Sequence, residues 1–176
     1  MGRFSGPDAL APGHVLDGFD CGVASLDEWL QRHARIATGA GSARTFVATD
    51  SDLRRVAGYH ALTVASVKPE DAPERVVKGM PRHEIPAILL ARLAVDSAAQ
   101  GRGLGAWLLR DAMLRAVAVS EEVGIRAMLA HAIDDSARDF YVRHGFEPSP
   151  TDPHNLQVII KDVKASLRSL AVHEAR

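Results

Sequence analysis

The chain of 176 residues has one cysteine, few aromatic residues and almost no net charge. Because a single thiol cannot form an internal disulfide, Cys21 indicates a protein of a reducing compartment. The eight histidines are scattered and show no metal-ligand spacing with cysteine, so no metal site is expected. The net charge of −1 argues against broad, non-specific binding of nucleic acid, although a local basic surface can still form.

Long hydrophobic runs are also missing. The amino terminus has no apolar stretch typical of a signal peptide, and no run is long enough to span a bilayer. We therefore expect a soluble, cytoplasmic protein without a membrane partner. The composition is otherwise that of an ordinary globular protein, with 47% hydrophobic and 24% charged residues, and the length suits one domain.

Alternating apolar and amphipathic segments predict an α/β sandwich. Ser25 and Glu28 have the spacing of a capping box, which predicts a helix that starts there. We expect a loose leader or edge segment over residues 1–14, a long surface loop with one helical turn over 68–86 and a polar helical tail over 163–176. The expected strands are 43–49, 56–67, 88–96, 125–133 and 156–163, and the other expected helices are 103–123 and 137–144.

One segment carries most of the functional information. The apolar strand 88–95 is followed by glycines at 101, 103 and 105, and an amphipathic helix then begins. The first N–H groups of a helix have no intrahelical partner, and the helix dipole favours negative charge there. Since glycine lets the backbone approach a ligand closely, the segment predicts a site for a pyrophosphate.

Three phosphate-binding patterns compete for this segment. A Walker loop is excluded because Gly105 is not followed by Lys and Ser/Thr. The dinucleotide pattern G-x-G-x-x-G fits poorly, since the glycines alternate. The pattern Gln-x-x-Gly-x-Gly of Gln100–Gly105 instead resembles the acyl-CoA loop of the GNAT superfamily of N-acetyltransferases. The plain alternative is a flexible turn.

The resemblance implies a GNAT fold, which is a mixed central sheet with helices on both faces in a single domain. It also implies that amides of the loop bind the pyrophosphate of acetyl-CoA and that the strand edge at Leu93 and Val95 pairs with the pantetheine arm. The residues expected to hold acetyl-CoA are Leu93, Ala94, Val95, Gln100, Gly101, Arg102, Gly103, Leu104, Gly105 and Ala106.

Tyr141 is the expected catalytic residue, because a GNAT helix at this place often carries a tyrosine that faces the thioester sulfur. A phenol with a pKa near 10 can donate a proton to the departing thiolate. The alternative is a packing role beside Phe140 and Phe146. Glu84, Asp96 and His131 are candidate bases, none of them compelling; an α-amine with a pKa near 7.7–8.0 needs little help from a base.

A narrower resemblance rests on residues 19–22, 26–27, 29–30, 43–47, 58–59, 61–62, 85–86, 90–96, 140–141 and 145–150. Together these stretches resemble one GNAT branch, the acetyltransferase toxins of type II toxin–antitoxin systems. This resemblance covers roughly residues 15–162 and implies acetylation of the α-amino group of aminoacyl-tRNA, which stops translation. It also implies a ribbon-helix-helix antitoxin, operator DNA bound only through that antitoxin, and a homodimer.

Arg44 and Arg92 are candidate contacts for tRNA phosphate or the antitoxin, or else ordinary strand arginines. The near-neutral charge does not by itself favour a tRNA acceptor. Basic residues at 54–55, 75, 78 and 82–83 offer a local surface for RNA, or else form a solvated loop. Two other functions stay open at this point. One is a GNAT that acetylates a small amine or a protein N-terminus, and the other is a non-catalytic CoA-binding regulatory module.

Overall fold

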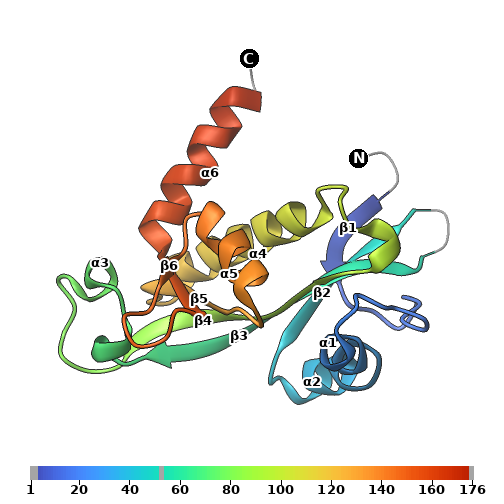
Figure 1. Ribbon diagram of the computed structural model, residues 1–176, viewed down its shortest axis with the longest axis horizontal. Helices are drawn as coiled ribbons and strands as arrows, with labels where there is room; N and C mark the ends of the chain where they lie inside the picture. The colour runs from blue at the N-terminus through green and yellow to red at the C-terminus, as the bar shows by residue number, and fades with distance from the viewer. Residues whose placement is uncertain (1–3, 52–53, 175–176) are drawn as a thin grey trace. The chain divides into compact units, whose positions relative to one another are not determined.

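The computed structural model describes residues 4–51 and 54–174, and its helices and strands are labelled in Figure 1. Seven strands form one sheet in the order β1-β2-β3-β4-β5-β7-β6. The β4–β5 pair is parallel, whereas β1–β2, β2–β3, β5–β7 and β6–β7 are antiparallel, so the predicted mixed sheet is confirmed. The strands are β1 (Phe4–Ala9), β2 (Arg44–Asp50), β3 (Val56–Val67), β4 (Ile85–Val95), β5 (Ala127–His131), β6 (Glu147–Pro148) and β7 (Asn155–Ile159).

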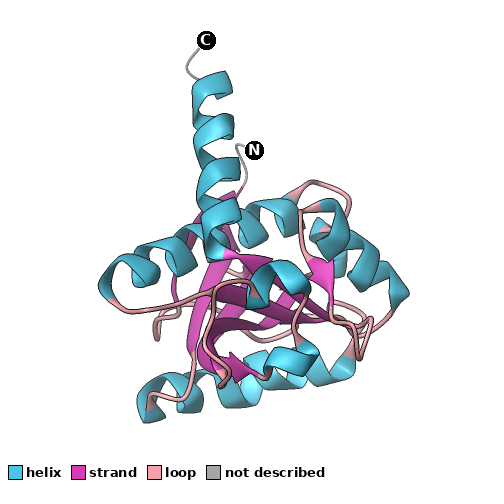
Figure 2. Ribbon diagram, turned by 90° about the vertical axis from the view of Figure 1, so that its left-hand side faces the viewer, coloured by secondary structure: helices cyan, strands magenta, loops and turns pink. Residues whose placement is uncertain are grey.

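Figure 2 shows the helices in cyan and the strands in magenta. Helices separate most of the strands along the chain, but β2 is followed directly by β3 and β6 by β7. A π-helical turn, Trp29–His33, joins α1 to α2, and short 3₁₀ turns cover Pro69–Asp71 and Ser97–Ala99. The α-helices are α1 (Ala24–Glu28), α2 (Ala34–Ala40), α3 (Glu74–Val77), α4 (Leu104–Glu122), α5 (Asp135–Arg143) and α6 (Ile160–Glu174). None of the helices in the described ranges is long and apolar enough to cross a membrane.

The chain divides into two compact units, and the division runs through β3, β4 and α4. The first unit contains the residues up to Thr63 together with Ala91–Ala112. The second contains Val64–Leu90 and the chain from Met113 onward. The glycine turn therefore belongs to the first unit, and the helix with Tyr141 belongs to the second.

In the first unit, helices cover both faces of the sheet. Neighbouring residues of β2 point to opposite faces. Val47 packs with Leu30 and Ala34 of the N-terminal helices, whereas Ala48 packs with Leu104 and Leu108 of α4. The expected arrangement of helices on two faces is thus present in this unit.

A close approach and a buried polar pair hold α4 against β3. A Cβ at Gly58 would lie 2.7 Å from Leu108 Cδ1, so glycine leaves room for the helix there. His60, fully buried, has its Nε2 2.7 Å from Asp111 Oδ2.

In the second unit, α3 packs on the strands through Val76, which shares a cluster with Ile85, Ala127 and Ile159. The helical turn expected within 68–86 is therefore present as α3, but the segment also contributes to the core, unlike a surface loop. Arg126 reinforces this packing, because its guanidinium donates to the carbonyl oxygens of Val76, Arg75 and Lys78.

Several expected boundaries were wrong. Val23, in extended conformation, is the N-cap of α1, so Ser25 lies inside the helix and the expected capping box is absent. Asp27 instead accepts a hydrogen bond from the Cys21 N–H at 2.9 Å. The last strand ends at Ile159, and α6 takes the residues expected to continue it. Of the two alternatives for the N-terminal segment, the edge segment is confirmed for Phe4–Ala9, which is strand β1 and pairs with β2.

Candidate active site

The turn after β4 is braced by Asp96, which is 7% exposed. Its Oδ1 accepts the Ala98 N–H at 3.0 Å and so caps the 3₁₀ turn. Its Oδ2 accepts the Asp20 N–H at 3.2 Å and lies 3.5 Å from Arg55 Nη2. Both oxygens therefore hold backbone in place, which makes Asp96 a structural residue of the turn and a poor general base.

Two glycines in a left-handed conformation directly precede helix α4. Gly101 and Gly103 have φ of +72° and +79°, a left-handed conformation that other residues adopt at a cost. Helix α4 then begins at Leu104, and the Trp107 N–H donates to the Gly103 carbonyl oxygen at 3.1 Å. The amides of residues 104–106 precede this first helical bond, so they have no intrahelical acceptor. A Cβ at Gly101 would meet nothing within 4 Å, so its backbone borders open space.

These features fit the pyrophosphate of acetyl-CoA. N–H groups at a helix N-terminus, together with the positive end of the helix dipole, bind anions. Arg102 adds a positive charge beside the turn, and its guanidinium carbon lies 4.5 Å from the centre of the Phe4 ring.

Gln100 braces the same turn. Its side-chain amide donates to the carbonyl oxygens of Val95 at 3.0 Å and of Cys21 at 3.1 Å. Since its N–H groups have partners in the protein, Gln100 supports the cradle, and a ligand contact of Gln100 stays a prediction. Leu93 and Val95 pack against the cluster that contains Leu104 and Leu108 of α4. Ala94 belongs to the cluster on the other face of the sheet.

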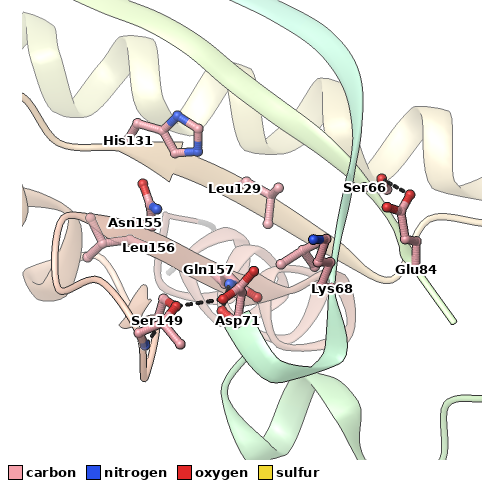
Figure 3. A pocket seen from close by; sticks show the side chains of 12 residues that line it. Ser66, Lys68, Asp71, Glu84, Leu129, His131, Ser149, Asn155, Leu156 and Gln157 are labelled. Atoms are coloured by element: carbon pink, nitrogen blue, oxygen red, sulfur yellow. Dashed lines mark hydrogen bonds between the residues drawn. The ribbon is translucent and has the colours of Figure 1, made fainter. Parts of the chain in front are cut away.

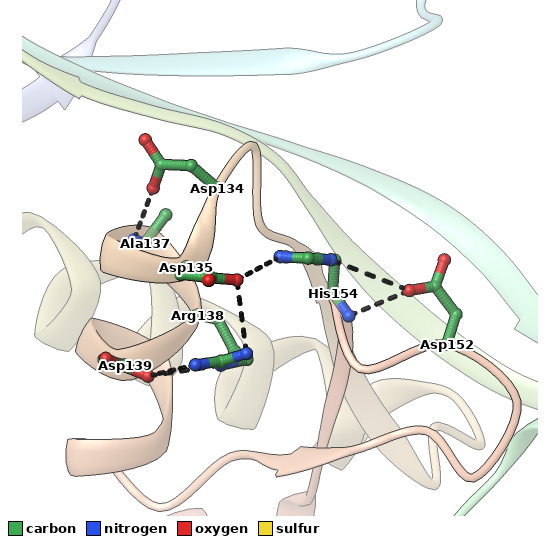
Figure 4. A network of polar contacts seen from close by, with 7 residues as sticks. All are labelled: Asp134, Asp135, Ala137, Arg138, Asp139, Asp152 and His154. Atoms are coloured by element: carbon green, nitrogen blue, oxygen red, sulfur yellow. Dashed lines mark hydrogen bonds and ion pairs between the residues drawn. The ribbon is translucent and has the colours of Figure 1, made fainter.

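Tyr141 lies on α5, which is anchored at its first turn (Figure 4). Asp134 caps the helix by accepting the Ala137 N–H at 2.8 Å. His154 Nε2 and Asp135 Oδ1 are 2.9 Å apart, which connects α5 to the segment before β7. The expected helix with an aspartate cap is therefore present, and its start is fixed by polar contacts.

The two tyrosines differ in the use of their hydroxyl groups. The Tyr59 hydroxyl donates to the Leu26 carbonyl oxygen at 2.8 Å. The Tyr141 ring is buried against Phe140 and Phe146, but its hydroxyl makes no hydrogen bond to any described residue. Burial raises the pKa of Tyr141 well above its usual value, so the phenol keeps its proton at neutral pH. Tyr141 thus combines a packed ring with an available donor.

Comparison with known proteins decides the family. Residues 41–148 match the model of the acetyltransferase (GNAT) domain. The chain belongs to the GNAT acetyltransferases. It is 44% identical over 165 residues to the tRNA-acetylating toxin of Mycobacterium tuberculosis, covering 94% of this chain and 98% of that protein.

Solved structures of GNAT toxins have the same fold. A tyrosine-to-phenylalanine mutant of KacT has a TM-score of 0.86 and 25% identity, covering 93% of this chain and 98% of that one. AtaT complexed with acetyl-methionyl-tRNAfMet has a TM-score of 0.84 and 27% identity, covering 91% and 97% of the two chains.

The basic residues that were candidate contacts for tRNA or the antitoxin differ in their surroundings. Arg92 lies over the Trp29 ring, 4.7 Å from its centre, and Trp29 stacks on Tyr59. This guanidinium therefore has a packing role, whereas Arg44 is an exposed residue at the start of β2. Among the basic residues, Arg75 is paired with Glu147 and Asp162.

The remaining base candidates, Glu84 and His131, line a polar pocket of the second unit (Figure 3). Sequence reasoning missed two other residues of this pocket, Asp71 and Gln157. A signal for Gln157 was present, because it interrupts the apolar strand β7 with a buried amide. Among the described residues, no three histidine, cysteine or acidic side chains lie together as a metal site.

Proposed function

We propose that this protein is an acetyl-CoA-dependent N-acetyltransferase that acetylates the α-amino group of aminoacyl-tRNA and acts as a toxin by blocking translation. One observation carries the proposal: the 44% identity to a tRNA-acetylating toxin extends over 94% of a chain whose glycine turn and α4 start are formed. AtaT, a structural neighbour, has been solved with acetyl-methionyl-tRNA, and the AtaTR complex with acetyl-CoA.

The residues of the glycine turn hold the donor. Acetyl-CoA, when bound, supplies the acetyl group as a thioester. The N–H groups of Leu104, Gly105 and Ala106 bind its pyrophosphate, and Gly101 and Gly103 keep side chains out of the way. The strand edge at Leu93 and Val95 orients the pantetheine arm. Asp96 and Gln100 keep this cradle in place through the contacts described above.

Tyr141 supplies the proton that the leaving thiolate needs. Its raised pKa keeps the hydroxyl protonated, and no described residue competes for that proton. General acid catalysis of this kind accelerates a reaction by about 10² to 10⁴. Two structural neighbours, KacT and AtaT, were solved as tyrosine-to-phenylalanine mutants, which supports a functional role for a tyrosine in such proteins.

The acceptor is an α-amine. Such an amine has a pKa near 7.7–8.0, so roughly a tenth of it is neutral at pH 7 without a base. A lysine side chain, with a pKa near 10.4, would need about 3 to 4 kcal/mol more for deprotonation. The engagement of Asp96 in the turn is consistent with an acceptor that needs no strong base.

The proposed partner is a ribbon-helix-helix antitoxin, and the complex contacts operator DNA through that antitoxin. The toxin itself is proposed to be a homodimer in the cytoplasm. The AtaT toxin has been solved bound to the C-terminus of its antitoxin AtaR, and KacTA has been solved with DNA. These two assemblies support an antitoxin for this chain as well.

The direct test is incubation of the purified protein with acetyl-CoA and a panel of charged tRNAs, followed by nuclease digestion and mass spectrometry. N-acetylated aminoacyl-adenosine is the expected product. A peptide with a free N-terminus and a simple alkyl amine serve as competing acceptors. If these are acetylated and charged tRNA is not, the enzyme is a GNAT of another substrate class.

A further inference from the structure

The second unit contains a polar pocket of about 330 Å³ (Figure 3). Strands β5 and β7 form one wall. Leu129 is paired with Gln157 and His131 with Asn155, and alternate residues of a strand share a face. These four residues therefore line the pocket together, and Leu156 borders it from the adjoining position of β7.

Gln157 has an unusual environment for an amide. It is 3% exposed and lies between the buried residues Leu156 and Val158. Its Nε2 donates to the Asp71 carbonyl oxygen at 2.8 Å, which identifies the nitrogen end of the amide. Its Oε1 is buried and has no hydrogen-bond partner within the described part of the chain. A buried acceptor without a donor is costly, so a ligand that supplies an N–H would be favoured here.

Two carboxylates line the same pocket, and each has acceptor capacity left. Asp71 Oδ1 accepts from the Thr151 hydroxyl at 2.7 Å, and Glu84 Oε2 accepts from the Ser66 hydroxyl at 2.6 Å. A carboxylate has about four acceptor sites, so these single bonds do not saturate either group. Lys68 is the one lysine of the lining, which leaves the pocket with one excess negative charge when His131 is neutral.

We propose that this pocket binds the primary ammonium group of a small ligand. An ammonium has three N–H donors and no acceptor. The pocket offers Gln157 Oε1, Asp71 and Glu84 as oxygen acceptors from three different segments. Its volume is near the lower end of ligand sites, which fits a compact molecule. A free alkyl amine and an ester-linked amino acid both carry this group.

The test is calorimetric titration of the full-length protein at pH 7 with two probes, putrescine and glycine methyl ester. Tetramethylammonium has the same type of charge but no N–H, so it is the matched control. We expect saturable binding of at least one probe and none of tetramethylammonium. The probe with the higher affinity identifies the source of the ammonium group.

Substitutions locate the site. Glu84→Gln and Gln157→Leu should each weaken binding about tenfold, as expected for loss of a hydrogen bond to a charged group. Glu122→Gln, on α4 and outside the lining, removes the same charge as Glu84→Gln and should have no effect. Because Glu84 is exposed, its variant stays informative if Gln157→Leu does not fold.

Three results would overturn the proposal: no binding of either probe, equal binding of tetramethylammonium, or unchanged affinity in Glu84→Gln. The measurement uses neither acetyl-CoA nor tRNA. Its failure therefore leaves the proposed acetyl transfer untouched, and failure of acetyl transfer leaves the binding result valid.

Discussion

The Gln100 side-chain amide donates to the Val95 carbonyl oxygen at 3.0 Å, which ties the glycine turn to the last residue of β4. Gln100→Ala removes this bond and the one to Cys21. We expect the KM for acetyl-CoA to rise about fivefold or more with kcat little changed, since each of the two net hydrogen bonds contributes about 0.5 to 1.5 kcal/mol. Gln31→Ala is the control, because the exposed Gln31 also donates to a carbonyl oxygen but lies off the turn. Equal KM changes in both variants would argue against a bracing role.

Gly101→Ala tests the backbone of the turn. An added Cβ meets no atom within 4 Å, so the cost comes from the left-handed φ alone, about 1 to 2 kcal/mol. Gly22→Ala has the same features, with φ +87° and open space around the Cβ. Chemical denaturation should show similar destabilisation in both, whereas binding of acetyl-CoA should weaken only in Gly101→Ala.

Gly58→Ala tests the packing of α4 on β3. The new Cβ would lie 2.7 Å from Leu108 Cδ1 and 3.1 Å from the Ala94 carbonyl oxygen, so side chain and backbone must both shift. We expect a loss of about 1 to 3 kcal/mol in the free energy of unfolding. Gly39→Ala, in α2 with open space around it, should be neutral or slightly stabilising. A stable Gly58→Ala protein would contradict the described contact.

Alkaline titration tests the environment of both tyrosines, the only two of the chain. Burial raises the pKa of Tyr59 and of Tyr141 above the usual value near 10. At about pH 10.5 the unfolded chain should show tyrosinate absorbance at 295 nm and the native protein almost none. Because the tyrosines of the unfolded state lose their protons first, their contribution to the free energy of unfolding is fully present below about pH 10. It falls as the pH rises further. Normal native titration would mean that the rings are not buried.

Local patterns in the sequence were sufficient for the family and much of the fold. The strand, the alternating glycines and the start of α4 are contiguous, so their geometry follows from nearby residues. The aspartate cap of α5 was likewise predictable, since Asp134 directly precedes the helix.

Features that depend on the contacts a side chain makes in the folded protein, rather than on its residue type, were not predictable. Asp96 resembled a base until its contacts with Asp20 and Ala98 were known. The donation from Gln100 Nε2 to the carbonyl oxygens of Val95 and Cys21 was not foreseen, and the predicted cofactor-binding role of Gln100 stays a prediction. The capping box at Ser25 had the right residue types, yet the helix begins before it because Val23 holds the extended N-cap conformation.

The central claim is that Tyr141 donates a proton during acetylation of aminoacyl-tRNA. The most direct measurement is the single-turnover rate of acetyl transfer to charged tRNA for wild type, Tyr141→Phe and Tyr59→Phe. We predict a rate loss of about 10² to 10⁴ in Tyr141→Phe, with acetyl-CoA affinity and folding retained. Tyr59→Phe should lose about 1 kcal/mol of stability, from its bond to Leu26, and little activity. A Tyr141→Phe enzyme as fast as wild type would contradict the mechanism.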